Sequence, residues 1–251
     1  MIILQIIFWF CLGLIVYTYL LFPAILSMLA RNKQEEGQKS PPSEWPTVSV
    51  LIAAFNEEKV IGEKIRSLLK SHYPLEQLEI LVGSDASTDQ TNHILKDLQQ
   101  EHPALHLTLF TERQGKPGII NQLAEKASGD ILVITDANVI LQPETLTQLI
   151  SGFINEQIGL VDSRLVNPGA NGVGISRQES FYISREVSIK HHESLLWGSM
   201  MGPFGGCYAV RKSLYQPVPN TFLVDDFFIN MSVLKQGFHC ISKLEAIVHE
   251  K

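Results

Sequence analysis

The sequence predicts an α/β protein with an open, mixed but mostly parallel sheet flanked by helices, preceded by one transmembrane helix. Three observations support this fold class. An uncharged apolar run covers residues 2–30, a polar proline-rich segment follows it, and from Thr47 onward short β-branched runs alternate with longer amphipathic ones. Strand and helix signals that alternate at this spacing indicate parallel strands joined by crossover helices.

The apolar run is the first predicted element, and it contains no charged side chain. About 20 apolar residues cross a bilayer as a helix, whereas a secretory signal has a positive start and a shorter apolar stretch. We therefore interpret residues 1–30 as a retained membrane anchor, in preference to a buried helix of a soluble domain. Arg31 and Lys33 follow the run and no basic residue precedes it, so the positive-inside rule predicts a cytoplasmic domain at the cell or inner membrane.

The polar segment at residues 31–46 is rich in proline and is typical of a linker. The remaining residues, 47–251, are predicted to form one domain, since 45% hydrophobic residues suffice for a core. A net charge of −6 argues against a nucleic-acid partner. Cys11, Cys207 and Cys240 are too widely spaced for a zinc knuckle or a disulfide framework, which fits a reducing compartment.

Within the domain, the apolar run at 47–55 predicts the first strand. The residues at 59–71 show the apolar spacing of an amphipathic helix. Val60, Ile61, Ile65, Leu68 and Leu69 form the apolar face of this helix. The pattern then predicts strands at 78–84, 105–110 and 130–136, and helices at 91–102, 118–128 and 143–155. A further helix and a glycine-rich loop are predicted within 176–206.

Acids and amides follow three of the predicted strands: Asn56 and Glu57 after the first, Asp85 and Asp89 after the second, and Asp136 and Asn138 after the fourth. Each has an ordinary structural explanation, because Asp85 or Asp89 can cap a helix and Asn56 can shape a turn. However, ligands of open α/β sheets bind beyond the carboxyl ends of the strands. Because polar residues occur at three such strand ends, the pattern favours a binding site over three separate structural roles.

Five motifs occur in an order and spacing that resemble family-2 glycosyltransferases with the Rossmann-like GT-A fold. They are "PTVSVLIAAFNEE", "VGSDASTDQT", "GKPGIINQLAEKASGDILVITDAN", "GGCYAVRKS" and "VDDFFI". The resemblance covers about Pro46 to Lys251. With its N-terminal anchor, the sequence resembles the membrane-bound branch of this family, which includes polysaccharide synthases.

The resemblance implies a nucleotide-sugar donor site, most simply for a UDP-sugar. The residues that match the family's donor contacts are Ala54, Asn56, Glu57, Asp85, Lys116 and Asp136. A carboxylate is a pure acceptor and suits the N–H of a uracil ring. Lys116 is a compact positive charge that suits a diphosphate, although a lysine beside glycine is often a solvated loop residue.

Asp136 and Asn138 match the family's acid-x-acid motif, which implies a metal ion, Mg²⁺ or Mn²⁺. These ions prefer hard oxygen ligands and share them with phosphate oxygens. The second acid is an amide here. Asn138 still offers a carbonyl oxygen but no charge, so Asp136, water and the diphosphate are expected to hold most of the ion.

Asp225 and Asp226 match the acid pair in which the second acid is the catalytic base of an inverting transfer. Such a base takes the proton of the acceptor hydroxyl. Two acids that open a helix also stabilise its positive end, which is the structural alternative. By the same resemblance, Gly205, Gly206 and Cys207 lie on the acceptor side. His191 and His192 are adjacent and lack zinc spacing, so we interpret them as ordinary helix residues.

Polymerising relatives continue past this pair with a Gln-x-x-Arg-Trp motif, whereas none of the tryptophans here follows an arginine. The expectation is either a C-terminally incomplete domain or a short relative.

The predicted function is a metal-dependent inverting glycosyltransferase of the hexosyltransferase type, which transfers a sugar to a carbohydrate or lipid-linked acceptor in envelope or extracellular polysaccharide synthesis. The alternatives are a catalytically incomplete nucleotide-sugar-binding module and, less favoured, a nucleotidyltransferase, whose glycine-rich phosphate loop is replaced by "AAFNEEKV".

Overall fold

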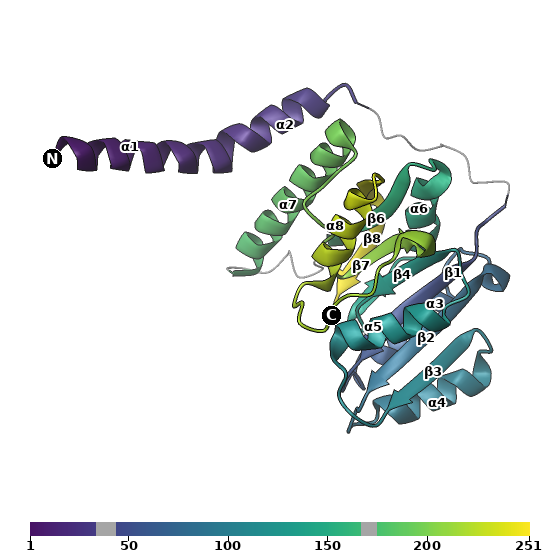
Figure 1. Ribbon diagram of the computed structural model, residues 1–251. Coiled ribbons are helices and arrows are strands. Elements are labelled where there is room, and N and C mark those ends of the chain that lie inside the picture. Colours follow the sequence, from purple (N-terminus) through teal and green to yellow (C-terminus); the bar gives the residue numbers. More distant parts are fainter. Residues whose placement is uncertain (34–43, 167–174) are drawn as a thin grey trace.

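A computed structural model describes residues 1–33, 44–166 and 175–251, with residues 175–181 described by their backbone only. Most of the predicted linker, residues 34–43, lies outside this range. A long helix at the N-terminus projects away from an α/β domain (Figure 1). It comprises α1 (Ile2–Val16), a π-helical stretch (Tyr17–Leu21) and α2 (Phe22–Ala30). The helix is long and apolar enough to cross a membrane, and α2 packs along α7 (Ile175–Trp197).

In the part of the chain that the structure describes, the domain is built on an eight-stranded sheet with the strand order β3-β2-β1-β4-β7-β6-β8-β5. Pairing is parallel among β1, β2, β3 and β4 and between β6 and β8, and antiparallel where β7 joins β4 and β6 and where β5 joins β8. The strands are β1 (Val48–Ala54), β2 (Leu78–Asp85), β3 (Leu105–Phe110), β4 (Ile131–Thr135), β5 (Val139–Leu141), β6 (Ile158–Val166), β7 (Cys207–Arg211) and β8 (His239–Glu250).

Helices cover both faces of the sheet (Figure 1). Those on one face are α3 (Ile61–Leu69), α4 (Thr91–Glu101) and α6 (Thr145–Ser151), and their apolar residues join one hydrophobic cluster. On the other face are α5 (Gly115–Lys126) and α8 (Asp225–Lys235), which form a second cluster. Single helical turns occupy Leu75–Gln77, Gly152–Ile154 and Lys212–Leu214.

This arrangement confirms the predicted fold class, a mixed and mostly parallel sheet flanked by helices with one long apolar N-terminal helix. Every strand predicted from Thr47 to Asp136 is present. The predicted helix at 143–155 is shorter, because its last turn, Gly152–Ile154, tightens into a 3-10 helix. The predicted apolar face of α3 is also incomplete, since Lys64 is fully buried among Ile61, Ile65 and Leu68.

Candidate active site

Polar side chains gather where β1, β2 and β4 end, around a pocket of about 290 Å³. The three strands are parallel neighbours, so their carboxyl ends lie at one edge of the sheet, where ligands bind in open α/β folds. The structure thus brings together the three strand ends that the sequence indicates. The residues that line the pocket are Ala53, Ala54, Phe55, Glu57, Asp85, Arg113, Lys116, Asp136, Ala137 and Asn138.

Asn56 shapes the turn that follows β1. Its φ of 56° is in the left-handed region, which asparagine tolerates better than most residues. Its Oδ1 accepts a hydrogen bond from the Thr88 backbone N–H at 2.8 Å, and its own backbone N–H donates to Ser87 Oγ at 3.2 Å. Asn56 therefore ties the turn after β1 to the loop after β2, which fits the turn interpretation of this residue.

Asp89 acts at the start of α4. Its Oδ1 accepts a hydrogen bond from the Thr91 backbone N–H at 2.9 Å, and its Oδ2 accepts one from the Glu58 backbone N–H at 3.1 Å. The first bond satisfies an N–H that has no partner inside the helix. Of the two acids after β2, Asp89 is therefore the one that caps the helix.

Asp85 is buried at the end of β2 and organises the loop that leads into α5. Its carboxylate accepts hydrogen bonds from the backbone N–H groups of Gln114 at 2.6 Å and Gly115 at 3.0 Å, and from Arg113 Nε at 3.0 Å. A carboxylate has about four acceptor positions, so three of them are filled within the protein. One position remains for a ligand N–H.

Arg113 and Phe55 form a part of the pocket wall that sequence reasoning missed. The Arg113 guanidinium lies 3.4 Å from the centroid of the Phe55 ring, in a cation–π contact. The only sequence signal is an aromatic residue directly after the first strand. A search for acids at strand ends does not reveal it.

Lys116 connects the pocket to the start of α8. Its Nζ lies 2.7 Å from Asp136 Oδ1 and 3.7 Å from Asp225 Oδ2. Burial lowers the pKa of Lys116, but the charges of Asp136 and Asp225 outweigh burial and raise that pKa above its ordinary value. Lys116 is therefore a permanent cation between two carboxylates, and the structure does not support the solvated-loop alternative.

Asp136 and Asn138 lie on the short turn between β4 and β5. The Asp136 backbone N–H donates to the Gly206 carbonyl at 3.0 Å, and Asn138 Nδ2 donates to Glu250 Oε1 at 3.2 Å. Burial and, as a smaller cause, the charge of Asp136 raise the pKa of Glu57, which lines the same pocket. Negative charge is thus concentrated at this end of the pocket.

The turn offers a divalent ion few protein ligands. Within residues 1–33, 44–166 and 175–251, no three His, Cys, Asp or Glu side chains cluster closely enough to hold a metal ion. Asp136 contributes one carboxylate, already paired with Lys116, and Asn138 contributes one neutral amide oxygen. The donor set therefore fits an ion only if a bound ligand supplies further oxygens.

Asp225 and Asp226 begin α8 but have different environments. Asp225 is buried, whereas Asp226 is partly exposed and its Oδ1 accepts a hydrogen bond from the Phe227 N–H at 2.7 Å. Burial is the main cause that raises the pKa of Asp226. The charge of Asp225 raises this pKa further, and the hydrogen bond from Phe227 partly opposes both effects. Gly205 has a φ of 86°, and a Cβ there would lie 2.5 Å from Asp226 Oδ2. A glycine at this position allows the loop to approach the carboxylate.

Gly206 and Cys207 are the other two predicted acceptor-side residues. The Gly206 carbonyl accepts hydrogen bonds from the Asp136 N–H at 3.0 Å and from Thr135 Oγ1 at 2.9 Å. Cys207 is buried in the hydrophobic core, and burial raises the pKa of its thiol to about 11. Its side chain thus packs in the core, and a contact between Cys207 and an acceptor stays a prediction.

Asp162 on β6 is a buried acid that sequence reasoning missed. Its Oδ2 accepts a hydrogen bond from the Phe204 N–H at 3.1 Å, which holds the glycine-rich loop, and its Oδ1 is buried without a hydrogen-bond partner in the described part of the chain. Burial raises the pKa of Asp162 to about 8, against the opposing charge of Lys190. In the sequence it appears only as an acid that interrupts the hydrophobic pattern of β6, so a search for acids at strand ends does not reveal it.

We expect Asp162 to make stability depend on pH. Its pKa is about 8 in the folded chain, above the ordinary value of 3.8, so the folded state binds the extra proton between these values. The resulting stability is fully present below pH 4 and is lost as pH rises through 8. In Asp162→Asn, melting temperatures measured from pH 5 to 9 should fall less than in the wild type. Parallel curves would show that Asp162 does not titrate in this range.

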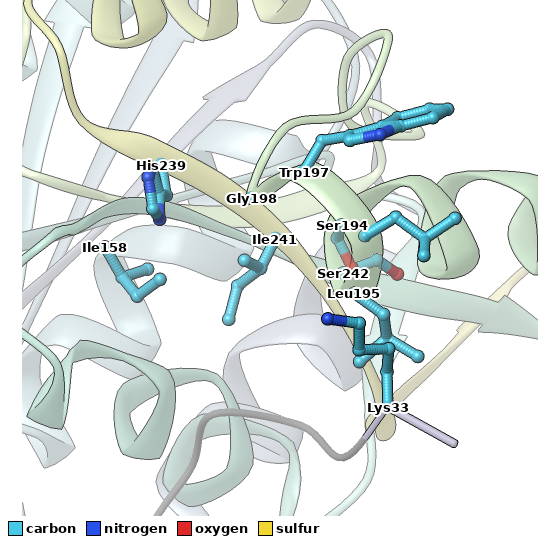
Figure 2. Close-up of a pocket in the computed structure, with 10 residues that line it drawn as sticks. Lys33, Ile158, Ser194, Leu195, Trp197, Gly198, His239, Ile241 and Ser242 are labelled. Atoms are coloured by element: carbon cyan, nitrogen blue, oxygen red, sulfur yellow. The ribbon is translucent and has the colours of Figure 1, made fainter. Parts of the chain in front are cut away.

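A second cavity, also of about 290 Å³, lies at the C-terminal end of α7 (Figure 2). Its described lining includes Lys33, Ser194, Trp197, His239 and Ser242, and no predicted site residue. The neighbouring His191 Nδ1 lies 3.3 Å from the Ser242 carbonyl. This cavity lacks the clustered carboxylates of the first pocket.

Several curated proteins are similar to this chain in sequence. A β-monoglucosyldiacylglycerol synthase of Trichormus variabilis is 32% identical over 163 residues, which are 64% of this chain and 35% of the relative. The probable glycosyltransferase YdaM of Bacillus subtilis is 29% identical over 78% of this chain and 48% of its own length. A poly(ribitol-phosphate) β-N-acetylglucosaminyltransferase, TarS of Staphylococcus aureus, is 30% identical over 56% of this chain and 24% of its own. The chain spans less than half the length of these relatives.

Solved structures share the fold. The mannosyltransferase PcManGT of Pyrobaculum calidifontis, solved with GDP-mannose and Mn²⁺, superposes with a TM-score of 0.76 at 25% identity over 94% of this chain and 66% of its own. A fragment of S. aureus TarS superposes with a TM-score of 0.62 at 20% identity, over 82% of this chain and 60% of that fragment.

The model of the family described as "Glycosyl transferase family 2" matches residues 49–218. This range contains β1, β2 and β4, the turns after them and Lys116, which together form most of the pocket. The match covers more than half of the chain. This protein therefore belongs to glycosyl transferase family 2.

Proposed function

We propose that this protein is an inverting glycosyltransferase that moves a sugar from a nucleoside diphosphate, most simply UDP, to a carbohydrate or lipid-linked acceptor. The observation that carries the proposal is the position of Lys116, 2.7 Å from Asp136 in the pocket and 3.7 Å from Asp225 at the start of α8. One cation thus links the predicted donor pocket to the predicted catalytic acids. The similar structure solved with GDP-mannose supports a nucleotide-sugar donor.

Donor binding is assigned to the pocket wall. The remaining acceptor position of Asp85 suits a ring N–H of the base, and the stacked Arg113 and Phe55 border the same pocket. Lys116 is the cation available to a diphosphate, since a charged N–H donor binds phosphate oxygens strongly. Binding the donor therefore requires Lys116 to exchange part of its contact with Asp136 for the diphosphate.

Transfer is a single displacement. The acceptor hydroxyl oxygen forms a bond to the anomeric carbon while the bond from that carbon to the diphosphate oxygen breaks on the opposite face. Asp226 takes the proton of the hydroxyl. Its raised pKa, caused mainly by burial, makes it a stronger base than an exposed aspartate. The charge left on the nucleoside diphosphate is then balanced by Lys116.

Asp136 and Asn138 are the residues that would hold Mg²⁺ or Mn²⁺, together with oxygens of the donor. The ion would supply positive charge next to the leaving diphosphate. The similar structure solved with Mn²⁺ supports this assignment. Because only Asp136 is charged, we propose that the ion binds mainly with the donor rather than ahead of it.

Replacing the amide tests this point. Asn138→Asp restores a second carboxylate, so the affinity for Mn²⁺ without nucleotide should rise by about tenfold, as expected for an added charge in a partly buried site. Calorimetry of Mn²⁺ binding measures the change. Asn155→Asp, in the loop before β6, is the matched control and should leave the affinity unchanged. Equal affinities of Asn138→Asp and wild type would exclude residue 138 from the metal site.

The N-terminal helix is proposed to anchor the chain in the cell membrane, with residues 31–46 as linker and 47–251 as a cytoplasmic catalytic domain. A lipid-linked acceptor fits the surroundings of Asp226. Phe222, Leu223, Val224 and Phe227 next to it are exposed, with Leu223 96% exposed. The relative named as a diacylglycerol glucoside synthase adds support.

The experiment is a turnover assay of the full chain in detergent micelles or nanodiscs. UDP-sugars and GDP-sugars are offered with diacylglycerol or a polyprenyl-linked sugar, and release of the nucleoside diphosphate is measured. We expect release with one donor class that depends on the acceptor. Binding of UDP by calorimetry without any release would instead favour a nucleotide-sugar-binding module.

A further inference from the structure

Lys64 is the most unusual residue near the pocket. It lies on the buried face of α3, between Ile61 and Ile65, and its side chain is 0% exposed. A buried ammonium group is costly unless its N–H donors are satisfied. Its Nζ donates to Thr135 Oγ1 at 2.7 Å and to the Val139 carbonyl, so its partners are neutral oxygens.

These partners lie at the two ends of the turn that carries Asp136. Thr135 is the last residue of β4 and Val139 the first residue of β5, and only Asp136, Ala137 and Asn138 lie between them. A single ammonium group thus holds both ends of a three-residue turn. Thr135 Oγ1 also donates to the Gly206 carbonyl at 2.9 Å, which extends the network to the loop that contacts Asp226.

Lys64 also contributes charge. Burial lowers its pKa to about 8, and the negative charge of Asp136 acts in the opposite direction, so Lys64 is still mainly a cation at neutral pH. Lys116 is a second cation and lies 2.7 Å from the Asp136 carboxylate. Asp136 therefore interacts with two positive charges, while the position two residues after it carries an uncharged amide.

We propose that Lys64 is a positioning residue with two effects on the site. Its hydrogen bonds to Thr135 and Val139 hold the turn that carries Asp136, and its charge makes the site favour the anionic diphosphate over a free divalent cation. The proposal deepens the proposed function and rests on it for the identity of the anion. It assigns a role to a residue that contacts neither donor nor acceptor. In this account Lys64 and Asn138 act in the same direction, because one adds a positive charge and the other omits a negative one.

The sign of two binding changes distinguishes this role from a purely structural one. If Lys64 only supports the fold, then its removal loosens the turn and lowers the affinity of the turn for every ligand. If its charge sets the preference of the site, then a neutral residue weakens nucleoside diphosphate binding and strengthens Mn²⁺ binding. We expect about tenfold in each direction for a charge at this depth.

The experiment compares the full-length wild type with Lys64→Met and Lys64→Gln, of which the second keeps an N–H donor without the charge. Lys70→Gln, at an exposed lysine just after α3, is the control. UDP and GDP binding are measured in EDTA and Mn²⁺ binding without nucleotide, below the melting temperature of each variant. Opposite changes in both Lys64 variants are the expected result. Losses of both affinities, or no change in Mn²⁺ affinity, would overturn the proposal. If the wild type binds neither nucleotide, the proposed function fails, and the Mn²⁺ comparison alone decides the role of Lys64.

Discussion

Asp226→Asn is expected to reduce the turnover of the full chain by a factor of about 10²–10⁴, the range that a general base contributes. The amide has nearly the same shape as the carboxylate, and its Oδ1 can still accept the hydrogen bond from the Phe227 N–H. It cannot take a proton from the acceptor hydroxyl at neutral pH. The rate of nucleoside diphosphate release measures the effect.

Two controls make this result specific. Asp97→Asn changes an exposed acid on α4 and should leave turnover unchanged. Donor affinity of Asp226→Asn should remain that of the wild type, because no donor contact is assigned to Asp226. Substantial turnover in Asp226→Asn would remove Asp226 from the role of the base, and a matching loss of donor affinity would show that it belongs to the donor site instead.

Lys116→Met should have the second largest effect, a loss of donor affinity of about 10- to 100-fold, as expected for a hydrogen bond to a charged group. Methionine fills a similar volume but offers the diphosphate neither charge nor donor. It also leaves Asp136 and the buried Asp225 without their shared cation, which adds repulsion toward an anionic ligand. Calorimetry with UDP measures the loss.

Lys126→Met at the other end of α5 is the matched control, since Lys126 is exposed and bonds only to Thr108 among the contacts described for it. Melting temperatures of both variants separate affinity from folding. Wild-type affinity in a folded Lys116→Met variant would mean that the diphosphate lies elsewhere, and the proposed function would lose the observation that carries it.

The first half of the domain was predictable because its sequence repeats one pattern. From Thr47 to Asp136 each buried strand is followed by an amphipathic helix, and β1, β2, β3 and β4 are all present with parallel pairing. The second half breaks that pattern. β5 has three residues, and β7 inserts antiparallel between β4 and β6. Such pairing depends on contacts far apart in sequence, which local periodicity does not encode.

The candidate site was predictable to the extent that polar residues stand at strand ends. Asp85, Asp136 and Glu57 follow that rule, and they share one pocket. Lys64 and Asp162 do not follow it, because Lys64 lies on an otherwise apolar face of α3 and Asp162 lies in the middle of β6, away from its carboxyl end. Their partners, Thr135 and the Phe204 N–H, come from elements more than 40 residues away. The sequence shows such residues only as interruptions of a hydrophobic pattern.

The measurement that tests the central claim most directly is the configuration of the transferred sugar. The full chain is incubated with an α-linked UDP-sugar and its acceptor, and the anomeric proton of the first product is followed by NMR while UDP release is counted. A single displacement assisted by Asp226 predicts a β-linked product that forms in equal amount with UDP, and that Asp226→Asn forms about 10²–10⁴ times more slowly. An α-linked product, or the same product from Asp226→Asn at the wild-type rate, would contradict the account.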